Sequence, residues 1–219
     1  MDFSFLPEFW GYFERGAGIT IYLSFFTVVF GTILGMLIAL MKMSSVKPLK
    51  WLGTAYVEFI RGTPLLVQVF IIFYGIPQIT PFDLPEFTAG IIALSINSAA
   101  YIAEIFRAGI ENIDRGQMEA ARSLGMKKSL AMRLVILPQA VKNILPALGN
   151  EFVVVIKESS IVSVIGIHEL MYNTNVVKAA TYQAFEPLIS AALVYFILTF
   201  TLSRLLSKFE RRLATSDRG

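Results

Sequence analysis

The sequence predicts an all-α membrane protein with five membrane-spanning helices and one short helix at the membrane surface. Hydrophobic residues make up 55% of the 219 residues and charged residues only 16%, with a mean hydropathy of +0.64. Soluble domains carry roughly 25% charged residues, and a soluble chain this apolar would lack the polar groups to cover its surface. The apolar residues also form continuous runs, whereas the strands of a membrane barrel would alternate.

Five of these runs are long enough to cross a bilayer core, which takes about 20 helical residues. The acidic N-terminal residues lack the basic region of a cleaved signal peptide, so we expect the first run to be a permanent helix. The expected division is an external segment 1–16, a membrane domain 17–213 and a cytoplasmic tail 214–219. The expected spans are residues 17–41, 52–74, 87–106, 134–156 and 185–206.

Lysine and arginine residues lie mainly on one side of these spans. Of the 19 basic residues, three lie between the first and second runs, six between the third and fourth, and five at or after the end of the fifth. Cytoplasmic segments of membrane proteins carry this excess of positive charge. The N-terminus is therefore expected outside and the C-terminus in the cytoplasm.

The second, third and fourth runs carry several ionisable and amide side chains, whereas the first and fifth are nearly free of charge. An ionisable side chain inside a membrane is costly unless it is paired or hydrated, and it often marks a transport pathway. These three helices are therefore expected to line a pathway or a subunit interface. The candidate substrate-path residues are Asn97, Ser98, Glu151, Glu158 and Ser160.

Each candidate has a structural alternative. Glu151 could pair with Lys142 or with a span of a partner subunit. Asn97 and Ser98 could form hydrogen bonds between neighbouring helices, a common use of small polar residues in membranes. Glu158 and the serines that follow it could form a solvated helix end.

Two pairs of charged residues are spaced three residues apart, as in helical ion pairs. They are Glu58 with Arg61, and Glu104 with Arg107, and we expect structural ion pairs at both. The chain has no cysteine, and His168 is its one histidine, so no metal or cofactor site is expected. No nucleophile with its base and no catalytic carboxylate pair emerges, so the protein is not expected to be an enzyme.

A polar segment between the third and fourth runs carries the signals of a short surface helix. Asp114 is a good N-cap, Gln117 can complete a capping box, and Gly125 can take the left-handed conformation that ends a helix. Small residues on this helix would let another protein approach closely, with charged contacts at the rim. The candidate docking residues of this helix, at about 114–125, are Glu119, Ala120, Ala121, Arg122, Leu124 and Gly125.

The same segment resembles the EAA loop of the inner-membrane permease subunits of ABC importers. The matching residues are Glu119-Ala120-Ala121-x-x-x-Gly125 and then Val135-x-Leu137-Pro138, with Val135 where the family has Ile. Other motifs resemble the polar amino-acid branch of this family, the histidine/arginine/glutamine type. They are Arg61-Gly62-Thr63-Pro64-Leu65, Asn97-x-x-x-Tyr101-x-x-Glu104-x-x-Arg107-x-Gly109-Ile110, Asp114-x-Gly116-Gln117 and Lys157-Glu158-Ser159-Ser160.

This resemblance implies the type I importer permease fold, in which the EAA loop is a coupling helix that docks into a cytoplasmic ATPase. It implies a complex of two permease subunits, an ATPase dimer and an extracytoplasmic amino-acid-binding protein, in the cytoplasmic (inner) membrane of a prokaryote. ATP and Mg²⁺ would bind to the ATPase, since this chain lacks the Gly-x-x-x-x-Gly-Lys-Ser/Thr phosphate loop. The implied mechanism is alternating access, and no nucleic-acid partner is expected.

The expected substrate is a polar amino acid, with basic ones favoured by the charges of Glu151 and Glu158. A glutamine or glutamate importer is the alternative, and both a homodimer and a pair of sister permeases are left open. Two other classes compete. An ion-coupled secondary carrier would normally show internal repeats, and a non-transporting membrane scaffold would tolerate loss of the polar residues in its spans.

Overall fold

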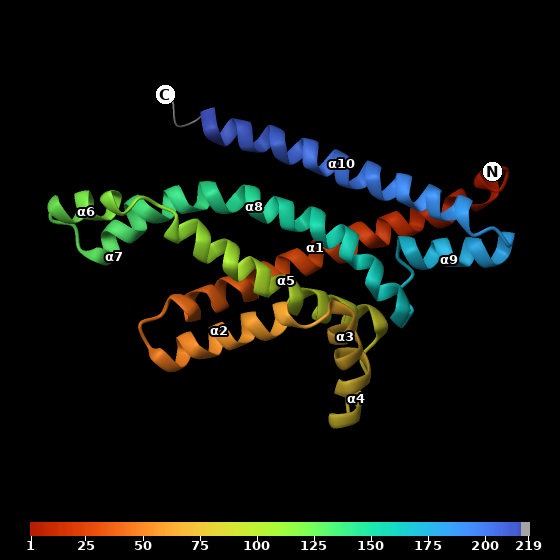
Figure 1. Cartoon of the computed structure of the whole chain (residues 1–219), viewed down its shortest axis with the longest axis horizontal. Coiled ribbons are helices and arrows are strands. Elements are labelled where there is room, and N and C mark those ends of the chain that lie inside the picture. The colour runs from red at the N-terminus through yellow and green to blue at the C-terminus, as the bar shows by residue number, and fades with distance from the viewer. Residues whose placement is uncertain (216–219) are drawn as a thin grey trace.

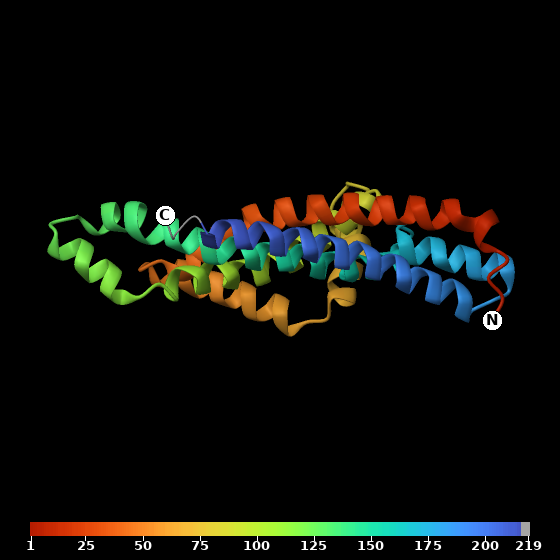
Figure 2. The same cartoon turned by 90° about the horizontal axis from the view of Figure 1, so that it is seen from above.

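The computed structural model describes residues 1–215, and all regular secondary structure in that range is helical. Four long helices run roughly along the long axis of the molecule (Figure 1), namely α1 (Leu6–Met43), α5 (Glu86–Glu111), α8 (Leu137–Glu158) and α10 (Phe185–Thr215). The short helices α6 (Arg115–Ser123) and α7 (Lys128–Ala131) form the tip at one end of the molecule. The N-terminus and α9 (Leu170–Thr181) lie at the other end in both views (Figures 1 and 2).

Three of the described helices are long and apolar enough to cross a membrane, namely Leu6–Met43, Glu86–Glu111 and Phe185–Glu210. A bent pair of helices, Lys47–Gly62 with Leu65–Ile79, makes a fourth if it counts as one span. The polar residues of α8 lower its hydropathy, and it is not among these helices. Length and composition thus give three or four spans in residues 1–215, and the expected count of five stays a prediction.

The expected continuous span 52–74 is wrong, because the chain turns sharply inside it. Helix α2 (Lys47–Gly62) and the segment Leu65–Ile79 meet at an angle of 107°. Pro64 lacks an N–H and pushes Thr63 into extended backbone, with φ −117° and ψ 146°. Beyond the break follow α3 (Leu65–Phe70), a π-helical turn (Ile71–Gly75) and α4 (Ile76–Ile79), which run across the long helices (Figure 1).

Gln68 satisfies the backbone groups that this break exposes. Its Nε2 donates to the carbonyl oxygen of Ile60 at 2.8 Å and to the carbonyl and hydroxyl oxygens of Thr63 at 3.1 and 2.9 Å. Its Oε1 accepts a hydrogen bond of 3.0 Å from Asn97 Nδ2 on α5. One buried amide therefore ends α2, begins the crossing segment and fastens both to α5.

Helix α1 begins at Leu6, eleven residues before the expected start of the first span. Pro7 fits the first helical turn, where no N–H partner is required. Phe13 of this added part packs with Leu170 and Val177 of α9 and Ala191 of α10 in a small core at the N-terminal end of the molecule. Most of the segment expected to precede the first span is therefore helical and continuous with it.

Helices α1 and α5 cross in close contact because α1 presents glycines where they meet. A Cβ added to Gly35 would lie 2.8 Å from the carbonyl oxygen of Ala99, and one on Gly31 would lie 3.3 Å from Ser98 Cβ. This approach brings the last turn of α1 beside the second half of α5.

The remaining boundaries differ from expectation by smaller amounts. A π-helical turn (Met132–Ile136) precedes α8, Pro138 lies in the first turn of α8, and Pro146 lies inside the helix without ending it. Helix α10 continues to Thr215, beyond the expected end at 206. Of the expected tail 214–219, residues 216–219 lie outside the described residues.

Candidate functional site

The surface helix predicted between the third and fourth runs is present as α6. Asp114 Oδ1 accepts a hydrogen bond of 2.6 Å from the Gly116 N–H, which confirms the N-cap. Gly125 has φ +86°, and the Met126 and Gly125 N–H groups donate to the carbonyls of Ala121 and Arg122 at 3.2 and 3.0 Å. This pair of bonds is the Schellman motif that glycine favours at helix ends.

The second half of the expected capping box is wrong. Gln117 Oε1 accepts a hydrogen bond of 3.4 Å from Gln139 Nε2 instead of turning back to Asp114. This exposed contact links α6 to the start of α8, because the α6–α7 hairpin folds back on α8.

The docking face also differs from expectation at one residue. Ala121 is only 4% exposed and faces its own chain, so it offers no surface to another protein. Glu119, Ala120 and Arg122 are exposed, and Leu124 beside them is 81% exposed at the tip of the molecule.

Of the candidate substrate-path residues, Glu151 lines a groove between the end of α2, α5 and α8, which we call the α2–α5–α8 groove. Its volume is about 460 Å³, within the range of roughly 300–1,000 Å³ that small-molecule sites occupy. Its polar lining residues are Arg61, Tyr101, Glu104, Asn112, Asn143 and Glu151.

Ser98 and Glu151 meet at this groove. The Ser98 hydroxyl donates to Glu151 Oε1 at 2.8 Å, joining α5 to α8, and Glu151 is 7% exposed. Asn97 points elsewhere, to Gln68. For Asn97 the structural alternative therefore describes the observed contact. Glu151 instead bonds to the Ser98 hydroxyl, and it has no cationic partner within residues 1–210.

The expected ion pair of Glu58 with Arg61 is wrong. Among residues 1–210, whose side chains are described, no ion pair joins them; the Arg61 guanidinium lies over the ring of Tyr101, 5.3 Å from its centroid. Residue spacing allows both arrangements, and the side chain of Arg61 extends toward the groove instead of along its own helix.

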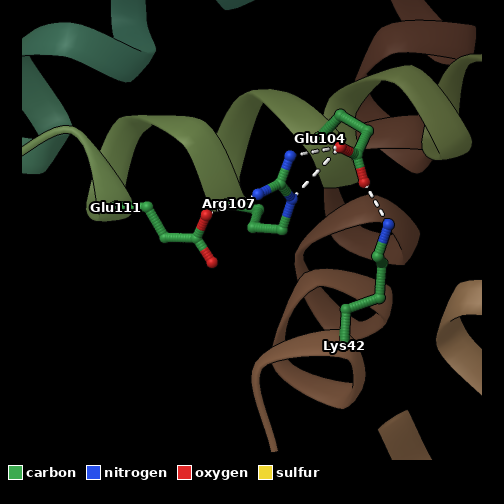
Figure 3. Close-up of polar contacts among 4 residues, drawn as sticks. All are labelled: Lys42, Glu104, Arg107 and Glu111. Carbon is green, nitrogen blue, oxygen red and sulfur yellow. Dashed lines mark hydrogen bonds and ion pairs between the residues drawn. The ribbon is translucent and has the colours of Figure 1, made fainter. Parts of the chain in front are cut away.

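The expected pair of Glu104 with Arg107 is confirmed and belongs to a larger cluster, the Glu104 network (Figure 3). Arg107 Nη2 and Nε donate to Glu104 Oε2 at 2.7 and 3.1 Å. Glu104 Oε1 also pairs with Lys42 in the last turn of α1, and Arg107 also pairs with Glu111 (Figure 3). The network ties the end of α1 to α5, one turn from the start of the loop that leads to α6.

The remaining candidates lie toward the other end of α8. Glu158 is partly buried, two turns beyond Glu151 on the same helix. The hydroxyl of Ser160 donates to the carbonyl oxygen of Lys157 at 2.7 Å, so it is occupied locally. His168 is exposed and stacks on Tyr172 with ring centroids 4.2 Å apart, and no metal-binding cluster of His, Asp and Glu occurs in the part of the chain that the structure describes.

Sequence reasoning missed the roles of Lys42, Gln68 and Glu169. Lys42 and Glu104 are 62 residues apart in the sequence, so no local pattern predicts their contact. Glu169 caps α9 by accepting from the N–H groups of Met171 and Tyr172 at 2.9 and 2.7 Å. An acidic residue directly before a helix was the available signal for that cap.

The comparison with protein families identifies the class. Residues 31–215 match the model of the binding-protein-dependent transport system inner membrane component, and the chain belongs to this family. The resemblance noted from the EAA loop is thereby confirmed.

Individual relatives cover nearly the whole chain. It is 42% identical over 217 residues to the arginine transport system permease protein ArtQ of Bacillus subtilis, covering 99% of each protein. It is 42% identical over 216 residues to a protein named probable glutamine ABC transporter permease GlnM of the same organism, covering 99% of this chain and 100% of that one. A crystal structure of an amino acid ABC transporter with histidines contains a chain with 54% identity and a TM-score of 0.93, covering 97% of this chain and 99% of that one.

Proposed function

We propose that this protein is the permease subunit of an ABC importer that moves a polar, preferably basic, amino acid across the cytoplasmic membrane by alternating access. The observation that carries the proposal is Glu151, a buried carboxylate at the wall of the α2–α5–α8 groove with a hydroxyl as its recorded partner. A carboxylate in such a place favours a cationic substrate. Similarity to an arginine permease agrees with this choice, and similarity to a glutamine permease supports glutamine as the second candidate.

We further propose five membrane crossings, with α8 and the bent α2–α3 segment among them. The N-terminal segment 1–16 is placed outside, the permease domain covers 17–213, and the tail 214–219 is cytoplasmic. The distribution of basic residues supports this orientation. The fold is compatible with it, because the end of α10 and the α6–α7 tip lie on the same half of the molecule, away from the N-terminus (Figure 1).

The α6–α7 tip is proposed to dock on a separate ATPase dimer, which binds ATP and Mg²⁺. The exposed face of Glu119, Ala120, Arg122 and Leu124 supplies the contact, while Gly125 fixes the turn behind it. A second permease subunit and an external amino-acid-binding protein complete the proposed complex.

Uptake by the complete complex in proteoliposomes tests the function. With ATP inside and binding protein outside, we expect L-arginine to accumulate faster than L-glutamine, and neither to accumulate without ATP. Uptake driven by an ion gradient alone would favour a secondary carrier. No uptake of any amino acid by an assembled complex would favour the scaffold.

Two tryptophan substitutions test the docking face. Ala120→Trp should abolish co-purification of the ATPase while leaving membrane insertion intact, because Ala120 is exposed on α6. Ala180→Trp, the same change at an exposed site on α9 at the other end of the molecule, is the control and should retain the ATPase. An ATPase that stays bound to both variants would remove α6 from the interface.

A further inference from the structure

Arg61 is exposed at the end of α2, and its partner there is an aromatic ring instead of a carboxylate. Its guanidinium lies against the ring of Tyr101, and it has no ion-pair partner within residues 1–210. Lys42 and Arg107, which lie further along the same helical interface, are both paired with Glu104. A cation in such a segment without a carboxylate partner is by default a candidate for ligand binding.

The position of Arg61 in the groove suggests what it binds. Arg61 and Glu151 line the same cavity of about 460 Å³. The third charged lining residue, Glu104, already accepts from two cations. Within residues 1–210, the groove therefore offers an arginine without a counter-ion from α2 and a carboxylate without a cation from α8, which matches a ligand that carries both charges.

The backbone under Arg61 is held firmly. Arg61 occupies the last turn of α2, two residues before the extended Thr63, and Gln68 and Thr63 fix this helix end. Helices broken in this way commonly form the substrate sites of membrane transporters. The cation–π contact with Tyr101 takes none of the N–H donors of Arg61, which remain for a planar, bidentate acceptor.

We propose that Arg61 binds the α-carboxylate of the transported amino acid, while Glu151 faces its other, cationic end. This inference rests on the proposed function. Arginine pairs with carboxylates through two parallel hydrogen bonds, which lysine does not reproduce. Because every amino acid has an α-carboxylate, Arg61 serves basic and neutral substrates alike, and Glu151 discriminates between them.

The test compares amino acids with their amides, which lack the carboxylate. The permease–ATPase complex in lipid nanodiscs, without the binding protein, is titrated with L-arginine, L-argininamide, L-glutamine and L-glutaminamide. Arg61→Met should weaken binding of both amino acids at least tenfold and of both amides less than twofold. Arg61→Lys should lie between wild type and Arg61→Met, and Lys178→Met, which removes a partly exposed lysine on α9, should change nothing.

The outcomes separate the two proposals. Equal weakening of acids and amides by Arg61→Met, or full retention of the preference for acids, would overturn the role of Arg61 and leave the importer in place. Equal weakening together with loss of complex stability would indicate a partner acid as the ligand of Arg61. Absence of binding and of uptake for all four probes in the wild type would overturn both proposals.

Discussion

Two groups of charges lie along α5, and they differ in how they are compensated. In the Glu104 network, Lys42, Glu104, Arg107 and Glu111 are joined by ion pairs from α1 to α5 (Figure 3). At the α2–α5–α8 groove, Arg61 has an aromatic ring and Glu151 a serine hydroxyl.

The difference separates charges that stabilise the fold from charges that remain available to bind a ligand. Charges removed from water are costly, and a mutual pair offsets that cost within the protein. A charge left without an ionic partner must be compensated by water or by something that enters the groove. The first group is expected to affect stability when it is changed, and the second to affect transport.

Glu151→Gln should have the largest effect on transport and leave stability unchanged. Glutamine keeps an oxygen for the Ser98 hydroxyl, so packing is preserved while the charge is lost. We expect arginine uptake to fall at least tenfold, equivalent to about 1.4 kcal/mol, with the melting temperature unchanged. A loss of stability comparable to that of Glu104→Gln would break the distinction between the two groups.

Glu104→Gln should act on stability. It leaves Lys42 and Arg107 without their shared carboxylate, in a part-buried place, and should cost about 1–3 kcal/mol. Thermal unfolding of the purified complex measures this loss. The KM for the transported amino acid should stay as in the wild type, and a changed KM would move Glu104 into the binding site.

Glu169 is a third kind of charge, a buried carboxylate that has hydrogen-bond donors instead of a cation as partners. It accepts two hydrogen bonds from backbone N–H groups and one of 2.8 Å from the Tyr195 hydroxyl. Burial raises its pKa above the ordinary value of 4.5, although these hydrogen bonds oppose the rise. Between pH 4.5 and the raised pKa, the folded protein therefore holds a proton that the unfolded chain has released. The free energy of unfolding falls as pH rises through this range.

The measurement is the melting temperature of wild type and Glu169→Gln from about pH 4.5 upward. The variant cannot titrate at this position, so the wild type should lose stability relative to it as pH rises. A difference between the two proteins that stays constant with pH would contradict the raised pKa.

Glu111→Gln should have the smallest effect. Glu111 is half exposed at the edge of the Glu104 network, and exposed pairs spaced four residues apart contribute about 0.3–0.5 kcal/mol. Its melting temperature should lie close to that of the wild type, and high salt should remove the remaining difference. A loss as large as that of Glu104→Gln would mean that the network acts as one unit.

Local signals in the sequence predicted the local structure well. The N-cap at Asp114 and the left-handed Gly125 depend on a few neighbouring residues, so the bounds of α6 were predicted almost correctly. Continuous hydrophobicity likewise predicted α1, α5 and α10, although with shorter bounds.

Features that depend on direction or on distant contacts were missed. Hydropathy is the same for a straight and a bent helix, so it predicts one continuous span across the turn at Pro64. The spacing of Glu58 and Arg61 does not determine side-chain rotamers, and Arg61 turned to Tyr101 instead. The inward face of Ala121 depends on how α7 folds back, which the pattern of α6 alone does not contain.

The amide of Gln68 has a mechanical consequence. Because Gln68 forms hydrogen bonds with α2, with the turn at Thr63 and with Asn97 of α5, these segments are expected to move as one rigid unit. Any bending during transport must then occur outside this rigid unit. Helix α10 is the part of the fold best suited to slide against it, because only 11% of the residues in its most apolar 18-residue stretch are buried.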